Sequence, residues 1–326
     1  MTRLMPSPRT LSTTAISVLA ITATTVAVAF ANTVTGTDDA DRLTGTPAAD
    51  TITAQAGNDR VRALAGDDVI DAGPGADRAW ASDGNDTVLG GDGNDYALGG
   101  RGDDKLAGDR DNDRLFGGPG TDTIQGGEGK DRLFGNAGDD VLQGDSADSA
   151  APGGADRVFG GAGDDKIGGG EGDDRLHGGD GRDELRGDNG NDRMSGGRGD
   201  DTQYGGPGDD VIFANLGVDT TYGGEGDDVL WALARGDVTG DDDTVGDTLV
   251  GENGDDTFRT RDGEADRIDC GPGDDRALLD LQDVIVDATP ENPNGSCETV
   301  ERKAPKKADA VPEDREESPS EDRLQS

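Results

Sequence analysis

The segment DRLFGGPGTDTIQGGEGKDRLFG, from Asp113 to Gly135, carries two periods at once. Its glycines and aspartates recur every nine residues, whereas the tetrad Asp-Arg-Leu-Phe returns only after eighteen. Side chains of a strand alternate in direction, so an eighteen-residue echo places every second unit on the same face. We therefore expect the nonapeptide to be the structural unit and two nonapeptides to complete one coil.

The nonapeptide extends over most of the chain. Each unit is anchored on the aspartate at its sixth position, which recurs every ninth residue from Asp41 to Asp140 and from Asp156 to Asp228. Four looser units follow, anchored on Asp247, Asp256, Asp266 and Asp275, which brings the array to about 25 units. The clearest units read Gly-Gly-x-Gly-x-Asp-x-U-x, where U is an apolar residue.

These units resemble the nonapeptide repeats of the RTX, or haemolysin-type, calcium-binding family. The resemblance covers roughly residues 36–280 and is clearest in units such as 117–125 and 126–134. It implies an all-β fold, a parallel β-roll or β-solenoid, with Ca²⁺ in the turns. In that family fold, six residues of each unit turn and bind the metal, and three form a short strand.

The turn chemistry favours calcium independently of the family. Glycine at positions 1, 2 and 4 permits positive φ and lets carbonyls converge, while the aspartate adds a carboxylate. Ca²⁺ takes six to eight oxygens at about 2.3–2.6 Å, whereas Mg²⁺ demands a tighter octahedron. The alternative is that glycine and aspartate merely form polar turns. We expect roughly 15–20 Ca²⁺ ions per chain.

The candidate metal ligands follow from this spacing. The carboxylates are Asp86, Asp95, Asp104, Asp113, Asp122, Asp131, Asp140, Asp156, Asp165, Asp174, Asp183, Asp192, Asp201, Asp210, Asp228, Asp256 and Asp275. The backbone carbonyls lie near Gly90, Gly99, Gly117, Gly126, Gly160, Gly169, Gly178, Gly196, Gly205 and Gly223. Units 3 to 6 begin with alanine, and unit 20 (214–222) has Thr221 at its U position, so we expect weak sites there.

The composition makes the metal a condition of folding. The chain of 326 residues has 71 Asp and Glu against 30 Lys and Arg, a formal charge of −41, and only 30% hydrophobic residues. So little apolar surface is typical of disordered chains, and bound cations would offset both the self-repulsion and the ordering entropy. The same acidity argues against nucleic acid as a partner.

The two kinds of unit differ in their outward residues. Numbered from Asp41, eight of the first nine odd units carry Arg at position 7, and none of the even units up to unit 20 does. Most aromatic residues occupy position 9, as in Phe116, Phe134 and Phe159. We expect the odd units to share one sheet, where these residues form either a structural cross-strand ladder or a docking stripe for an anionic or carbohydrate partner.

The ends of the chain predict export. Residues 1–31 have the pattern of a secretory signal peptide, with a membrane anchor as the weaker alternative, and no other segment is apolar enough to span a membrane. Cys270 and Cys297 are expected to form a disulfide in a secreted, extracellular protein, although two free thiols are the alternative. The remaining predicted divisions are a first roll block (32–143), an inserted loop (144–154), a second block (155–231), an acidic loop (232–246), degenerate repeats with a cap (247–300) and a disordered tail (301–326).

No catalytic constellation is visible in the sequence. The single histidine, His177, occupies an outward position, so a Ser-His-Asp triad or a His-rich zinc site is not expected. Three functions remain: a secreted calcium-dependent structural or interaction module, a calcium-sequestering matrix or surface protein, and a cryptic polysaccharide-acting enzyme. The first is the preferred interpretation, with a cell-surface glycan or protein as the possible partner.

Overall fold

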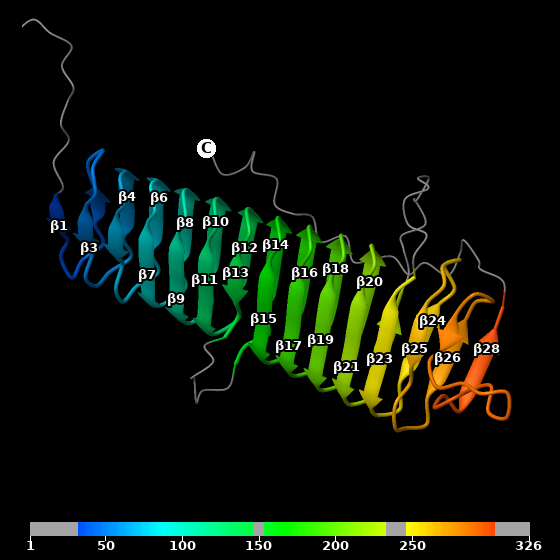
Figure 1. The fold of residues 1–326 in the computed structure, drawn as a ribbon. Coiled ribbons are helices and arrows are strands. Elements are labelled where there is room, and N and C mark those ends of the chain that lie inside the picture. The colour runs from blue at the N-terminus through cyan, green and yellow to red at the C-terminus, as the bar shows by residue number, and fades with distance from the viewer. Residues whose placement is uncertain (1–31, 146–152, 233–245, 304–326) are drawn as a thin grey trace, which may run out of the picture.

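The computed structural model describes residues 32–145, 153–232 and 246–303. All regular secondary structure in these residues is β-strand, arranged in two parallel sheets of 14 strands each, and consecutive strands alternate between the sheets. The strands stack into one long solenoid (Figure 1). The predicted signal peptide lies outside the described residues, as do nearly all of the tail and most of both inserted loops.

The first sheet holds the odd-numbered strands. They are β1 (Thr33–Thr35), β3 (Thr51–Thr53), β5 (Val69–Asp71), β7 (Thr87–Asp92), β9 (Lys105–Arg110), β11 (Thr123–Glu128), β13 (Val141–Gln143), β15 (Lys166–Glu171), β17 (Glu184–Asn189), β19 (Thr202–Pro207), β21 (Thr220–Glu225), β23 (Thr248–Asn253), β25 (Arg267–Asp269) and β27 (Val284–Ile285).

The second sheet holds the even-numbered strands. They are β2 (Arg42–Thr44), β4 (Arg60–Ala65), β6 (Arg78–Asp83), β8 (Tyr96–Arg101), β10 (Arg114–Pro119), β12 (Arg132–Ala137), β14 (Arg157–Ala162), β16 (Arg175–Asp180), β18 (Arg193–Arg198), β20 (Val211–Leu216), β22 (Val229–Trp231), β24 (Thr257–Thr260), β26 (Arg276–Leu279) and β28 (Thr299–Arg302). We refer to this sheet, which carries the arginine-bearing odd units, as the arginine sheet.

The register confirms the two-nonapeptide coil. Strands β10 and β12 pair in parallel, with Leu115 beside Leu133 and Phe116 beside Phe134, a shift of eighteen residues. The pairing continues across the predicted insertion, where Arg132 lies beside Arg157. The insertion therefore leaves the stack unshifted, because the next unit returns to the sheet that its sequence predicts.

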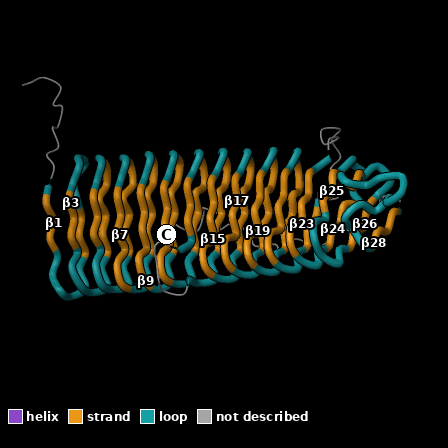
Figure 2. The backbone as a smooth tube through the Cα atoms, turned by 60° about the horizontal axis from the view of Figure 1, so that its bottom comes forward, coloured by secondary structure: helices purple, strands orange, loops and turns teal. Residues whose placement is uncertain are grey.

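The strands are longer than the three residues that the family pattern implies. Most of them have six residues, as in β10, which includes the first three positions of the following unit. Gly118 adopts φ +124° but still pairs with Asn136, so the ladder continues past the glycine. The connection to the next strand is then only three residues long, and Figure 2 shows these short loops along both edges.

The core is a narrow file of U residues between the two sheets. Leu115, Ile124 and Leu133 are among those with at most 1% of their surface exposed. Two consecutive U positions of the first sheet are polar, because Gln203 and Thr221 occupy them. The core divides there into two apolar clusters, and the Gln203 amide donates a hydrogen bond to the Phe213 carbonyl at 3.0 Å.

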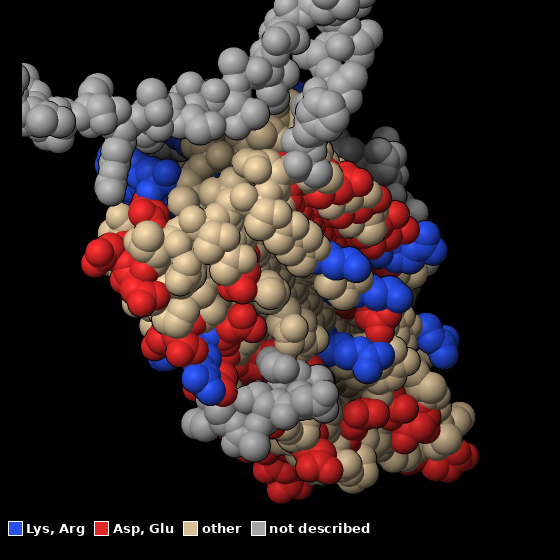
Figure 3. All heavy atoms as spheres, turned by 90° about the vertical axis from the view of Figure 1, so that its left-hand side faces the viewer, with Lys and Arg blue, Asp and Glu red and all other residues tan. Residues whose placement is uncertain are grey.

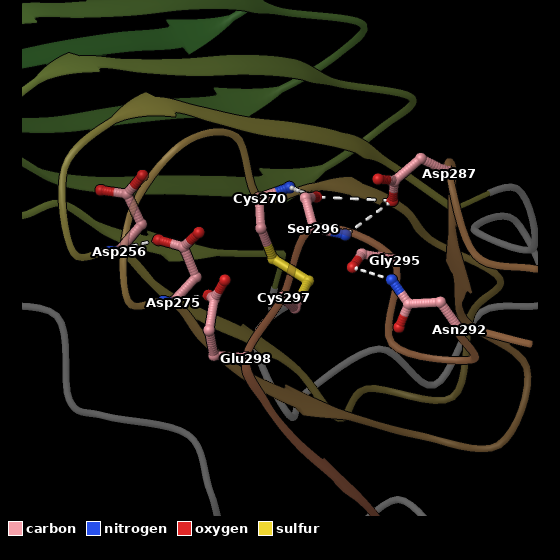
Figure 4. Close-up of a disulfide and its surroundings, with 9 residues drawn as sticks. All are labelled: Asp256, Cys270, Asp275, Asp287, Asn292, Gly295, Ser296, Cys297 and Glu298. Carbon is pink, nitrogen blue, oxygen red and sulfur yellow. Dashed lines mark hydrogen bonds between the residues drawn. A yellow bond between two sulfur atoms is a disulfide. The ribbon is translucent and has the colours of Figure 1, made fainter.

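A disulfide between Cys270 and Cys297 ties the last coils together, as predicted. The two half-cystines are buried, and the Ser296 hydroxyl accepts a hydrogen bond from the Cys270 N–H (Figure 4). Closing a loop of this size stabilises the fold by about 3 kcal/mol. Strands β27 and β28 end the two sheets.

Candidate metal centre

A row of buried aspartates follows the turns on each edge of the solenoid. Each is the sixth residue of its unit, and nearly all are at most 2% exposed. One carboxylate oxygen, Oδ1, accepts the backbone N–H of the aspartate one coil earlier: Asp122 accepts from Asp104 at 2.8 Å, and Asp131 from Asp113 at 2.8 Å. Because an aspartate turns inward every nine residues, the two edges carry parallel carboxylate files.

The second carboxylate oxygen of these aspartates, Oδ2, has no hydrogen-bond partner among the described residues. This holds for all seventeen predicted carboxylates, from Asp86 to Asp275. A buried charged oxygen without a partner costs several kcal/mol unless a counter-charge meets it. A cation facing Oδ2 would satisfy these oxygens, so the donor set fits a hard divalent ion.

The glycines shape the space in front of this oxygen. A Cβ added to Gly117 would clash with Oδ2 of Asp122, so only glycine leaves that side open. Gly118 and Gly120 have φ of +124° and +145°, and a Cβ on either would clash with the carbonyl of Gly100 or Gly102 in the preceding coil. The turns therefore stack with their backbones close together and bring carbonyl oxygens toward the carboxylate.

Among the described residues, no three His, Cys, Asp or Glu side chains converge on one point. Each turn supplies one carboxylate of the file, so a multi-oxygen shell has to draw mainly on backbone carbonyls, as the sequence predicts for Gly99, Gly117 and their equivalents. When bound, Ca²⁺ supplies the positive charge that the files lack. The chain's own residues hold the carboxylates apart, turn them inward and exclude water from them.

Burial raises the pKa of these carboxyl groups. Burial is the largest effect at Asp113; the Asp95 N–H hydrogen bond opposes it, and the charges of Asp131 and Asp95 add to it, so that the pKa rises to about 8. The same causes raise the pKa of Asp192 to about 8 and that of Asp122 to about 7. Without cations, the folded chain at neutral pH therefore retains protons that an unfolded chain would release.

The structure extends the carboxylate files beyond the predicted ligands. Asp219, which is not among the predicted ligands, occupies an equivalent buried position, and Asp266, also not among them, is equally buried and has the same unpartnered Oδ2. The same is true of three aspartates in the alanine-started units, Asp59, Asp68 and Asp77. The nine-residue spacing alone would have identified four of these five residues, and Asp266 follows a ten-residue step. The ligand role of every aspartate in the files remains a prediction.

A second polar ladder was missed by the sequence analysis. Asn94 Oδ1 accepts the N–H of Asn112 at 3.0 Å, and Asn112 Oδ1 accepts that of Lys130 at 3.0 Å. These residues occupy position 5 of their units, where Asn and Asp recur in many repeats. Short side-chain oxygens at this position hydrogen-bond neighbouring backbone groups, and here they join the exposed turns of successive coils.

Fold and site together define a class of protein: a parallel β-solenoid whose turns contain files of buried carboxylates suited to divalent cations. The family model of the RTX calcium-binding nonapeptide repeat matches the chain repeatedly, over residues 28–61, 35–70, 44–79, 63–97, 80–115, 89–124, 116–148, 153–176, 168–203 and 204–232. The chain belongs to this family. No curated protein sequence matches it significantly.

Replacing one carboxylate of the file tests its role. In Asp122→Asn, the remaining oxygen still accepts the Asp104 N–H, but the charge is lost. We expect the variant to bind about one or two fewer Ca²⁺ ions and to need about twofold more calcium for half-maximal folding. Equilibrium dialysis and circular dichroism measure the two effects.

Asp103→Asn is the matched control for this substitution. Asp103 is exposed, and its Oδ1 accepts the Thr121 N–H at 2.9 Å, which an asparagine also does. Both variants remove one negative charge, but only Asp122 lies in the buried file. Equal calcium binding by the two variants would show that the buried carboxylate is not a ligand.

Acid should lower the calcium requirement for folding. Burial raises the pKa of Asp113, Asp156 and Asp192 to about 8, whereas an unfolded chain releases these protons at about pH 4. Between pH 8 and pH 6, protons therefore bind the folded state and not the unfolded chain, and they stabilise the fold. We expect the calcium concentration at half-folding to fall from pH 8 to pH 6, and fewer Ca²⁺ ions to bind per folded chain, because protons and calcium compete for the same oxygens. Calcium titrations followed by circular dichroism and equilibrium dialysis at the two pH values measure these changes, and a midpoint that rises toward pH 6 would contradict them.

Proposed function

We propose that this chain is an exported structural module whose β-roll forms on Ca²⁺ and presents one face to a partner. The observation that carries the proposal is the files of buried carboxylates, in which the Oδ2 of all seventeen predicted ligands has no hydrogen-bond partner among the described residues. Membership of a calcium-binding repeat family supports calcium as the ion. The regular glycine turns provide carbonyl oxygens, and carboxylate and carbonyl oxygens are the ligands that Ca²⁺ prefers.

Export is supported by two features. The Cys270–Cys297 disulfide suits an oxidising compartment, and residues 1–31 have the composition of a signal peptide. None of the described residues forms a helix long and apolar enough to cross a membrane. We infer that the mature chain begins at Asn32, which amino-terminal sequencing of protein from the culture medium tests directly.

The proposed role is structural rather than catalytic. The buried carboxylates are held by backbone hydrogen bonds within a regular file that repeats along the solenoid. Calcium sequestration is the second candidate, because the same files would hold many ions at once. For a polysaccharide-acting enzyme, the described residues offer no arrangement that recurs as the carboxylate files do, so we do not propose this function.

Counting the ions tests the proposal. Equilibrium dialysis of the purified mature chain should give roughly 15–20 bound Ca²⁺ ions, with binding coupled to the gain of β-structure. A module that folds on calcium gains structure steeply over a narrow range of metal concentration. A sequestering protein that is already folded would bind the same ions with no change in circular dichroism.

A further inference from the structure

Aromatic rings form a continuous ladder across the arginine sheet. Neighbouring ring centroids lie 4.7 to 6.2 Å apart from β6 to β16, in the order Trp80, Tyr96, Phe116, Phe134, Phe159 and His177. Arg62 stacks over the ring of Trp80 at 5.6 Å. The structural ladder that the sequence predicts is therefore present. It does not explain the arginines at the centre of the same face.

Three of those arginines lack partners. The guanidinium groups of Arg78, Arg114 and Arg132 make no hydrogen bond or ion pair with any described residue, and all three residues are exposed. Some arginines elsewhere are paired, as in Arg110 with Asp92 at 3.2 Å and Arg182 with Asp164 at 3.3 Å. In a chain with 71 acidic residues, three neighbouring unpaired arginines need an explanation.

The explanation lies in the local absence of acids. In the odd units 3 to 13, the outward positions 5, 7 and 9 hold no Asp or Glu, whereas the even units between them carry Asp67, Asp71, Asp103 and Asp139 at these positions. Positive charge is thus concentrated on one sheet of a polyanion. In the view along the solenoid, basic and acidic side chains are exposed on both flanks (Figure 3).

A hollow of about 710 Å³ lies among these arginines. It forms because Tyr96 interrupts the file of arginines at position 7, so Arg78 and Arg114 flank a half-buried ring instead of a third cation. The partly exposed Trp80 and the exposed Lys130 and Arg132 also line it, together with the exposed Ala76, Asn94 and Asn112. The buried carboxylates of Asp77, Asp95 and Asp113 lie beneath them. The hollow thus joins aromatic faces to four cationic groups.

We propose that this hollow binds an anionic polysaccharide, through sugar units that bear carboxylate or sulfate groups. The planar guanidinium forks of Arg78, Arg114 and Arg132 match such groups in bidentate geometry. The partly exposed rings of Trp80 and Tyr96 offer apolar surface that a sugar ring can contact. The arginines of adjacent coils repeat every ~4.8 Å along the solenoid, which favours a linear polymer. This proposal rests on the proposed function in one respect, because the hollow exists only in the calcium-bound roll.

The acidic residues outside the hollow disfavour densely charged polyanions. A nucleic acid carries about one charge per 1.7 Å of duplex, and the acidic edges of the roll would repel it strongly. A sugar polymer with more widely spaced charges can bind the arginines with less electrostatic repulsion from these edges. Neutral glycans would leave the guanidinium groups unpaired and should bind much more weakly.

The test uses the calcium-loaded mature protein and three polymers with one backbone: dextran, carboxymethyl-dextran and dextran sulfate. Biolayer interferometry at physiological salt should show binding to at least one anionic dextran and little to dextran. Arg114→Gln/Arg132→Gln should weaken that binding about tenfold, and Tyr96→Ala should weaken it to a lesser extent. Which anionic polymer binds distinguishes carboxylated from sulfated sugars.

The control removes the same charge elsewhere. Arg182→Gln/Arg198→Gln deletes two arginines that pair with Asp164 and Asp180, outside the hollow, and should leave binding within about twofold. Calcium bridging between acidic protein and polymer would be equal in both double variants, so an equal loss in both would overturn the site. Tighter binding to a single-stranded oligonucleotide than to either anionic dextran would also overturn it. Circular dichroism of each variant in calcium shows separately whether the roll has formed.

Discussion

In excess EGTA, the mature chain should lose most of its β-structure and expand. Apolar burial is confined to one narrow file of U residues, since only 30% of the sequence is hydrophobic. The carboxylate files oppose folding: burial raises the pKa of Asp201 and Asp228 to about 8, so ionising them in the fold costs free energy. Calcium removes this cost and much of the repulsion among the acidic residues.

Circular dichroism and small-angle scattering measure this loss, and re-addition of calcium should restore both signals. Sodium chloride at equal ionic strength screens exposed charges but does not coordinate Oδ2, so it should not restore the fold. Mg²⁺ should be less effective, because it gives up its waters reluctantly and demands octahedral geometry. A strand signal that persists in EGTA would contradict calcium-dependent folding.

The second large effect is expected at Gly118. Its φ of +124° is accessible to glycine and strongly unfavourable for a β-branched residue, and a Cβ there would clash with the Gly100 carbonyl. Gly118→Val should destabilise the calcium-bound roll by about 3 kcal/mol. Guanidinium unfolding in saturating calcium measures the change in the free energy of unfolding.

Gly118→Asn is the matched comparison. Asn136 lies beside Gly118 on the next coil and has a φ of +77°, so asparagine is tolerated at this position of the repeat. We expect Gly118→Asn to cost about 1 kcal/mol. Pro119→Ala, at the exposed end of the same strand β10, should have a smaller effect. If valine and asparagine are equally destabilising, backbone conformation is not the reason for glycine at this position.

Much of the fold follows from the spacing of a few residue types. The echo of Asp-Arg-Leu-Phe predicts that Leu115 and Leu133 are neighbours in one sheet, and the structure pairs them. Strand alternation then sends the U residue and the sixth-position aspartate inward and the arginine between them outward. The insertion before Arg157 does not disturb this, because the residues after it repeat the same face-specific pattern.

The carboxylate site was predictable in its residues but not in its atoms. That Asp122 turns inward follows from its position, whereas the division of labour between Oδ1, which accepts a backbone N–H, and Oδ2, which has no partner, requires two stacked coils. The same holds for Asn112, whose side chain bridges coils only at the observed register.

The sequence alone therefore determined the repeat unit, the two-unit coil and the inward and outward faces, because each depends on local alternation and spacing. With only two cysteines, it also allowed one disulfide, which the structure contains. Tertiary structure alone decided which groups meet across coils eighteen residues apart. In both carboxylate files it leaves the aspartate Oδ2 atoms without a hydrogen-bond partner among the described residues. It divides the apolar core at Gln203, and it forms a hollow where Tyr96 lies between arginines. These features arise from contacts between successive turns, and a linear pattern does not specify which atoms make them.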